Sequence, residues 1–157
     1  MASRYHEVYD ASRSDPEKFW LDAAGKLVWT KKPTRALDPD AGVYGRWFPD
    51  GECNTCFNAI DRHVEAGRGD QVAIIHDSPV TGGKRRLTYG ELLVEVKALA
   101  ANLTDLGVGR GDRVIIYMPM VPETMIGMLA CARIGAIHSV VFGGFAAREL
   151  AAHIDDA

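Results

Sequence analysis

Several features that would point directly to a function are absent from this sequence. The chain has three cysteines in 157 residues and no apolar segment after its N-terminal charges, so we expect a reduced, cytoplasmic protein without a secretory signal. The longest apolar-leaning stretch, residues 114–147, is interrupted by prolines and charges, which favours a buried core over a membrane span. A net charge of −3 gives no bulk attraction to nucleic acid or to an anionic membrane.

Sequences typical of phosphate-binding loops and metal sites are also missing. No G-x-x-x-x-G-K-[ST] sequence occurs, which excludes a Walker-type NTPase within these residues. Cys53 and Cys56 have the C-x-x-C spacing of redox and zinc sites, but a zinc site needs a second ligand pair, which His63 alone does not supply. We therefore interpret the two cysteines as small, semi-buried residues at a helix start. No histidine has an evident triad partner, so we expect neither a metal site nor a catalytic residue.

The patterns that are present divide the chain into two parts. Residues 1–53 form an irregular helical arm, in which Ser14 or Asp15 can cap a helix and Trp47 and Phe48 are expected anchors. Residues 54–157 alternate between helical and strand patterns, which predicts an α/β fold. The expected helices lie near 54–66, 88–106, 122–134 and 146–154, and the expected strands near 72–76, 113–117 and 137–141.

Local sequence signals support two of these predictions in more detail, the 88–106 helix and the strands on either side of the 122–134 helix. Thr88 and Glu91 have the spacing of a capping box, and the helix after them places Leu92, Val96, Leu99, Leu103 and Leu106 at helical intervals. The apolar strands on either side of the 122–134 helix predict a parallel β-α-β unit with a buried helix.

Two glycine clusters could contact a ligand. Gly107, Gly109 and Gly111 resemble a dinucleotide fingerprint, but they follow a helix and open a strand, so we interpret them as a helix end and a turn. Gly143 and Gly144 follow a strand and precede a helix, where free backbone N–H groups can meet an anionic ligand. The pattern alone leaves two interpretations open for this pair: ligand contact or a packing turn.

Long segments of the chain resemble a known family. The stretch "RGDRVIIYMPMVPETMIGMLACARIGAIHSVVFGGF", together with "EKFWLDAAGKLVWTKKP" and "RWFPDGECNTCFNAIDRHVE", is similar to the acetyl- and propionyl-CoA synthetase branch of the adenylate-forming acyl-CoA synthetases. The segment 54–82 and Ala146, where acetyl enzymes tend to carry Ser, look more like propionyl-CoA synthetases. The resemblance covers nearly the whole chain and implies that it corresponds to about the first quarter of such an enzyme, with a partial parallel sheet flanked by helices.

The resemblance also implies a reaction and a site. A short-chain carboxylate and ATP would give an acyl-adenylate, from which CoA would release acyl-CoA and AMP, with Mg²⁺ offsetting phosphate charge. Phe142, Gly143 and Gly144 match the family's CoA-contacting loop, whereas its catalytic motifs lie beyond residue 157. A chain of residues 1–157 alone is therefore expected to be inactive, to bind no cofactor tightly, and either to self-associate or to repack its arm over the exposed face. A short, non-catalytic α/β binding or interaction module is the alternative.

Overall fold

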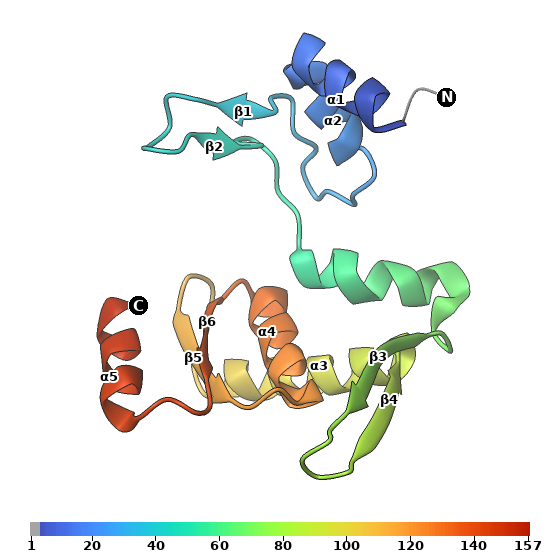
Figure 1. Ribbon diagram of the computed structural model, residues 1–157. Coiled ribbons are helices and arrows are strands. Elements are labelled where there is room, and N and C mark those ends of the chain that lie inside the picture. The colour runs from blue at the N-terminus through green and yellow to red at the C-terminus, as the bar shows by residue number, and fades with distance from the viewer. Residues whose placement is uncertain (1–3) are drawn as a thin grey trace. The chain divides into compact units, whose positions relative to one another are not determined.

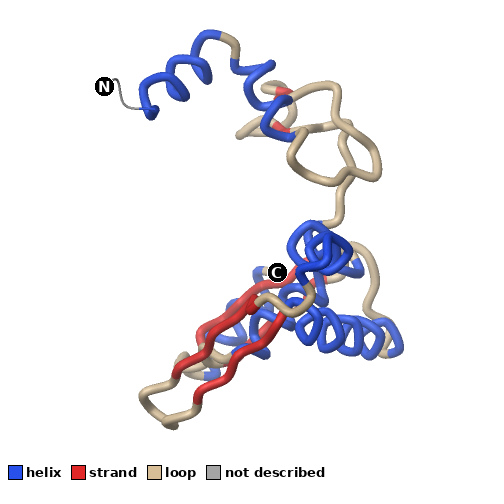
Figure 2. Tube along the Cα trace, turned by 90° about the vertical axis from the view of Figure 1, so that its right-hand side faces the viewer, coloured by secondary structure: helices blue, strands red, loops and turns tan. Residues whose placement is uncertain are grey.

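The computed structural model describes residues 4–157. They form two compact units, and the boundary along the chain falls between Cys53 and Asn54. We call residues 4–53 the N-terminal arm and residues 54–157 the body. Figure 2 shows that loops make up much of the arm, whereas helices and paired strands dominate the body.

The N-terminal arm contains two helices, α1 (Arg4–Ser14) and α2 (Pro16–Ala24), and two short antiparallel strands, β1 (Leu37–Asp38) and β2 (Arg46–Trp47) (Figure 1). Asp15 caps α2, because its carboxylate accepts a hydrogen bond of 3.0 Å from the backbone N–H of Lys18. The prediction of a cap at Ser14 or Asp15 is therefore confirmed, with Asp15 as the capping residue.

Side-chain contacts connect the loops of the N-terminal arm. The Glu17 carboxylate accepts a 2.7 Å hydrogen bond from the N–H of Ala36. The rings of Trp47 and Trp20 lie 5.3 Å apart between centroids, and those of Phe48 and Trp29 lie 5.5 Å apart. Trp47 and Phe48 thus anchor the loops to other parts of the arm, as predicted.

The body begins with a helical segment and a hairpin. The segment is wound in wide π-type turns, η1 (Phe57–Asp61) and η2 (Val64–Arg68), where the sequence predicted an α-helix. Strand β3 (Val72–Asp77) then pairs antiparallel with β4 (Lys84–Thr88). The strand β4 was not predicted, because the polar residues of "KRRLT" follow a turn-rich stretch and hide its alternation.

Helix α3 (Tyr89–Asp105) follows with the predicted capping box: Thr88 Oγ1 accepts from the N–H of Glu91 at 3.2 Å, and Glu91 Oε2 accepts from the N–H of Thr88 at 2.8 Å. Leu92 and Val96 are buried as expected. Leu106 continues the apolar spacing but does not join the buried face: it is 81% exposed, because it caps the helix that ends at Asp105. Gly107 (φ +89°) continues the turn toward the next strand, which confirms its interpretation as part of a helix end.

A parallel β-α-β unit completes the body. Strands β5 (Arg113–Met118) and β6 (Ile137–Phe142) pair in parallel from Arg113 opposite Ile137 to Met118 opposite Phe142, and α4 (Pro122–Ile134) connects them. This pairing confirms the prediction. Helix α5 (Ala147–Asp156) lies on the opposite side of the strand pair from α4 (Figure 1).

The main core of the body lies between η1, α3, α4 and the end of β4. Its buried members are Cys56, Ile60, Leu87, Leu92, Val96, Ala100, Ile126 and Ala130. Among residues 4–157, no helix has the length and apolar character needed to cross a bilayer. Helix α4 contacts α3 of this core as well as both strands of the β5–β6 pair.

Candidate functional site

The three predicted CoA-contacting residues lie together at the C-terminal end of β6. Phe142 is the last residue of the strand, and Gly143 and Gly144 are the central residues of a turn. The N–H of Phe145 closes this turn by donating to the carbonyl of Phe142 at 3.1 Å. We call residues 142–145 the glycine turn.

Close backbone packing requires glycine at position 143, whereas at position 144 a larger residue would have to displace the exposed ring of Phe142. The N–H of Gly143 donates to the carbonyl of Met118 at 3.2 Å, and a Cβ at position 143 would lie 2.9 Å from Met118 C and from Pro119 N. A Cβ on Gly144 would lie 2.6 Å from Cε1 of the Phe142 ring. The packing interpretation of the pair therefore has direct support, and contact with a ligand stays a prediction.

The solvent side of the glycine turn carries two aromatic rings. Phe142 and Phe145 are 57% and 46% exposed, and their ring centroids lie 5.8 Å apart in an edge-to-face arrangement. Helix α5 starts directly afterwards, and Ala146 gives its first turn no side-chain cap. Exposed rings beside the N–H groups of a helix start suit a ligand with both a stacking part and an anionic part.

Two side chains outside the predicted set also contact the glycine turn. Tyr117 on β5 donates its hydroxyl to the carbonyl of Phe145 at 2.5 Å. The ring of His153 on α5 stacks parallel to that of Phe145, with centroids 6.2 Å apart. The parallel pairing of β5 with β6 could have indicated Tyr117, since it places this residue beside the end of β6.

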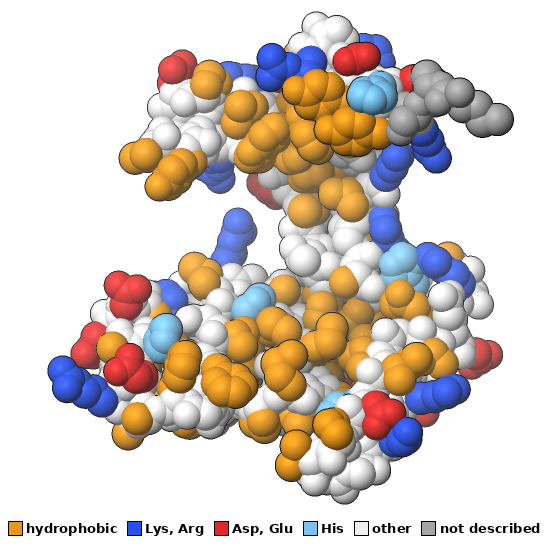
Figure 3. All heavy atoms as spheres, in the orientation of Figure 1, with side chains coloured by type: hydrophobic (Ala, Val, Ile, Leu, Met, Phe, Trp, Pro, Cys, Tyr) orange, Lys and Arg blue, Asp and Glu red, His pale blue; other side chains and the backbone are white. Residues whose placement is uncertain are grey.

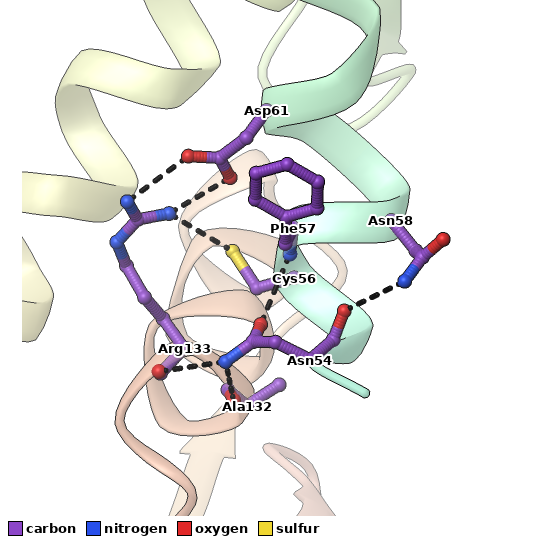
Figure 4. Close-up of polar contacts among 7 residues, drawn as sticks. All are labelled: Asn54, Cys56, Phe57, Asn58, Asp61, Ala132 and Arg133. Carbon is purple, nitrogen blue, oxygen red and sulfur yellow. Dashed lines mark hydrogen bonds and ion pairs between the residues drawn. The ribbon is translucent and has the colours of Figure 1, made fainter. Parts of the chain in front are cut away.

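A second group of polar contacts, which the sequence interpretation missed, joins the start of the body to the end of α4 (Figure 4). Arg133 donates to both carboxylate oxygens of Asp61, at 2.8 and 3.0 Å, and its Nη1 lies 3.6 Å from the sulfur of Cys56. The Asn54 side chain donates to the carbonyls of Arg133 and Ala132 at 2.9 and 3.4 Å. We call Asn54, Cys56, Asp61 and Arg133 the Arg133 cluster.

Electrostatics indicate a structural role for the Arg133 cluster. Its hydrogen bonds with Asp61 raise the pKa of the Arg133 guanidinium. Burial raises the pKa of the Cys56 thiol, and the contact with Arg133 opposes this only in part. A thiol with a raised pKa is a poor nucleophile. An arginine in an otherwise apolar helix requires a partner, which was the available signal for this cluster.

Metal binding finds no support in the same region. Across the part of the chain that the structure describes, no group of three or more His, Cys, Asp or Glu side chains could hold a metal ion. Cys56 lies at the start of η1, as interpreted, but neither cysteine is semi-buried: Cys56 is fully buried and Cys53 is exposed.

Comparisons with known proteins match nearly the whole chain. The family model of the AMP-binding enzyme matches residues 60–157, and that of the acetyl-coenzyme A synthetase N-terminus matches residues 5–59. The acyl-CoA synthetase short-chain family member 3, mitochondrial, of Homo sapiens is 52% identical over 153 residues, which cover 98% of this chain and 22% of that protein.

Two bacterial proteins that match this chain are also named as CoA synthetases. The acetyl-coenzyme A synthetase of Streptomyces coelicolor is 53% identical over 151 residues, which are 96% of this chain and 23% of the relative. The structure of the acetoacetyl-CoA synthetase from Streptomyces lividans matches with a TM-score of 0.81 and 27% identity, over 94% of this chain and 23% of that one. The chain thus spans less than a quarter of the length of these relatives. It belongs to the AMP-binding enzyme family, and its first residues match the N-terminal segment of the acetyl-coenzyme A synthetases.

Proposed function

We propose that this chain is the N-terminal part of an ATP-dependent short-chain acyl-CoA synthetase. The complete enzyme converts propionate or acetate, ATP and CoA to acyl-CoA, AMP and pyrophosphate through an acyl-adenylate. One observation carries the proposal: two family models in succession, one of them specific to acetyl-coenzyme A synthetases, cover residues 5–157.

In this proposal the present chain contributes to the second step, in which the CoA thiol attacks the adenylate. Phe142, Gly143 and Gly144 contact CoA: the exposed Phe142 ring packs beside it, and the backbone N–H groups at the start of α5 favour its anionic part. The exposure of the glycine turn and the uncapped start of α5 support this assignment. No residue of this chain is assigned a catalytic role.

ATP and CoA act as substrates of the complete enzyme, and Mg²⁺ would accompany ATP. Residues 4–157 contain no cluster of carboxylates, histidines or cysteines fit for a metal, so no step through Mg²⁺ is assigned to them. For the acyl group we propose propionate before acetate, because segment 54–82 and Ala146 look more like propionyl-CoA synthetases. We also propose a cytoplasmic location; the name of the human relative states a mitochondrial one for that protein.

Two assays on the complete protein test the proposed function. ATP–pyrophosphate exchange, measured with propionate and with acetate in the absence of CoA, reports adenylate formation. AMP release on addition of CoA reports the second step. We expect exchange that depends on the carboxylate and a larger signal with propionate. A protein that shows no carboxylate-dependent exchange would contradict the ligase assignment, whereas a larger signal with acetate would contradict only the acyl preference.

A polypeptide of residues 1–157 alone is expected to lack both activities and to self-associate. Apolar side chains are exposed on β6 and α5, among them Ile137, Val140, Phe142 and Ile154, and Figure 3 shows many hydrophobic side chains on one face of the body. Exposed apolar patches and open strand edges promote association. Light scattering measures this directly. An active monomer would contradict the prediction, and an inactive, stable monomer would favour a binding or interaction module.

A further inference from the structure

The Tyr117 hydroxyl donates a hydrogen bond to the glycine turn. Within residues 4–157, no other side chain of β5 does so. Tyr117 is the penultimate residue of β5 and lies opposite Val141, one position before the end of the parallel pairing. Its hydroxyl reaches past Phe142 to the carbonyl of Phe145, 28 residues further along the chain.

Three hydrogen bonds fix the glycine turn, and each has a different role. The bond from Phe145 N–H to the Phe142 carbonyl closes the turn upon itself, and that from Gly143 N–H to the Met118 carbonyl joins its first half to β5. Among residues 4–157, only the Tyr117 bond joins the second half of the turn to the strand. Without it, the turn could pivot about Gly143 while its internal bond stays intact.

Phe145 is the point at which these contacts converge. Its N–H and its carbonyl are both used, and its ring contacts Phe142 on one side and His153 on the other. A shift of the Phe145 backbone would therefore carry the Phe142 ring and the start of α5 with it. Those two features are the ones to which the CoA contact is assigned.

We propose that Tyr117 is a positioning residue for the CoA step: its hydroxyl sets the position of the glycine turn relative to β5 and does not itself contact CoA. This inference rests on the proposed function of the glycine turn. Tyr117 is 39% exposed, so its one neutral hydrogen bond contributes little to global stability. Its loss should affect the position of the turn far more than the fold, and small displacements of binding groups have large kinetic effects.

The test uses Tyr117→Phe in the complete protein, because this change removes one hydroxyl and keeps the ring. We expect the KM for CoA to rise about tenfold, with ATP–pyrophosphate exchange and kcat unchanged within about twofold. Tyr44→Phe is the matched control, since Tyr44 lies in the N-terminal arm and is 94% exposed. It should leave all three quantities unchanged.

Hydrogen exchange gives a readout that does not depend on activity. In the absence of substrates, the amides of residues 142–148 should exchange several-fold faster in Tyr117→Phe than in the wild type or in Tyr44→Phe, while those of η1 and α3 should not change. Faster exchange confined to the turn would support a local positioning role. Unchanged exchange at the turn, or faster exchange throughout the body, would overturn it.

The kinetic outcomes separate this proposal from the one on which it rests. If the wild type shows no CoA-dependent AMP release, both fail. If the wild type is active and Phe142→Ala raises the KM for CoA while Tyr117→Phe does not, the CoA assignment stands and the role of Tyr117 is refuted. An equal loss in pyrophosphate exchange and in the CoA step would also refute it, because a positioning role in the CoA step predicts a selective effect.

Discussion

The N-terminal arm and the body are stabilised by different kinds of interaction. The buried residues of the arm are small, namely Ala24, Pro33 and Ala36, and its loops depend on hydrogen bonds and ring contacts near the surface. In the body, large side chains such as Ile60 and Val96 are at most 1% exposed. Burial of apolar area is the larger stabilising contribution, whereas water competes for surface hydrogen bonds.

This difference predicts two levels of stability within one chain. The body should unfold as a cooperative unit, because its helices and strands share one core. The N-terminal arm should open locally at a lower free energy, because few of its contacts exclude water. Substitutions in the two regions can therefore test the comparison.

The largest effect is expected for Ile60→Ala in the core of the body. Removing this side chain leaves a cavity between η1 and α3, and the free energy of unfolding should fall by about 2–5 kcal/mol. Hydrogen exchange of the slowest amides of the body measures this loss. Val43→Ala in the N-terminal arm, where the side chain is 92% exposed, is the control and should change stability by less than about 0.5 kcal/mol. Comparable losses of unfolding free energy in the two variants would contradict the predicted difference in stability between the body and the N-terminal arm.

A slightly smaller effect is expected in the Arg133 cluster. Asp61→Leu leaves the largely buried Arg133 guanidinium without its carboxylate and should destabilise the body by about 3 kcal/mol. The double variant Asp61→Leu with Arg133→Met removes both charges and should be more stable than Asp61→Leu alone. Urea unfolding midpoints of the three proteins measure this. A double variant that is no more stable than Asp61→Leu alone would show that the unpaired charge is not the reason for the loss.

Helix caps allow a matched test of the two regions. Thr88→Ala and Asp15→Ala each remove one side-chain cap, which contributes about 1 kcal/mol. Because α3 belongs to the core, the loss at Thr88 should speed hydrogen exchange throughout the body. The loss at Asp15 should speed exchange in α2 alone. If Asp15→Ala also speeds hydrogen exchange in α3, the arm and the body do not unfold independently.

The smallest effect concerns the pH dependence of the N-terminal arm. The Thr34 hydroxyl, helped by the N–H groups of Thr34 and Arg35, lowers the pKa of the Asp50 carboxyl. Since the folded-state pKa lies below the unfolded-state value of about 3.9, the stabilisation is complete above that value and is lost as the pH falls through the folded-state pKa. Pepsin cleavage within residues 34–50 should increase below about pH 4 in the wild type. In Asp50→Asn the rise should be smaller than in the wild type by the part that Asp50 contributes, with pepsin's own pH dependence common to both proteins. Identical profiles would exclude this carboxyl as a cause.

Local signals predicted much of the fold. The capping box at Thr88 and the apolar strands flanking α4 placed α3 and the parallel pair, since neighbouring residues determine these features. The hairpin strand β4 was missed because its alternation is carried by arginines, and the π-type winding of η1 has no simple sequence signature. Leu106 fits the helical spacing but lies beyond the helix end, where spacing alone gives no information.

The site was less predictable than the fold. Sequence spacing identified Gly143 and Gly144, but the atoms that a Cβ at position 143 would meet, Met118 C and Pro119 N, lie at the end of β5, 24 or more positions earlier in the chain. The contacts of Tyr117 with Phe145 and of Arg133 with Asp61 join residues 28 and 72 positions apart. Such contacts depend on the packed arrangement of elements, which local patterns do not contain.

The bond between Asn54 and the carbonyl of Arg133 spans 79 residues, and this separation has a consequence for biosynthesis. At translation rates of about 5–20 residues per second, Arg133 is added roughly 4–16 seconds after Asn54. During that interval Cys56 and Ile60 have already been synthesised, whereas α4, which shares their core, has not yet been made. The start of the body must therefore stay unassembled for seconds in every newly made chain, which makes it a segment that nascent-chain chaperones are expected to bind.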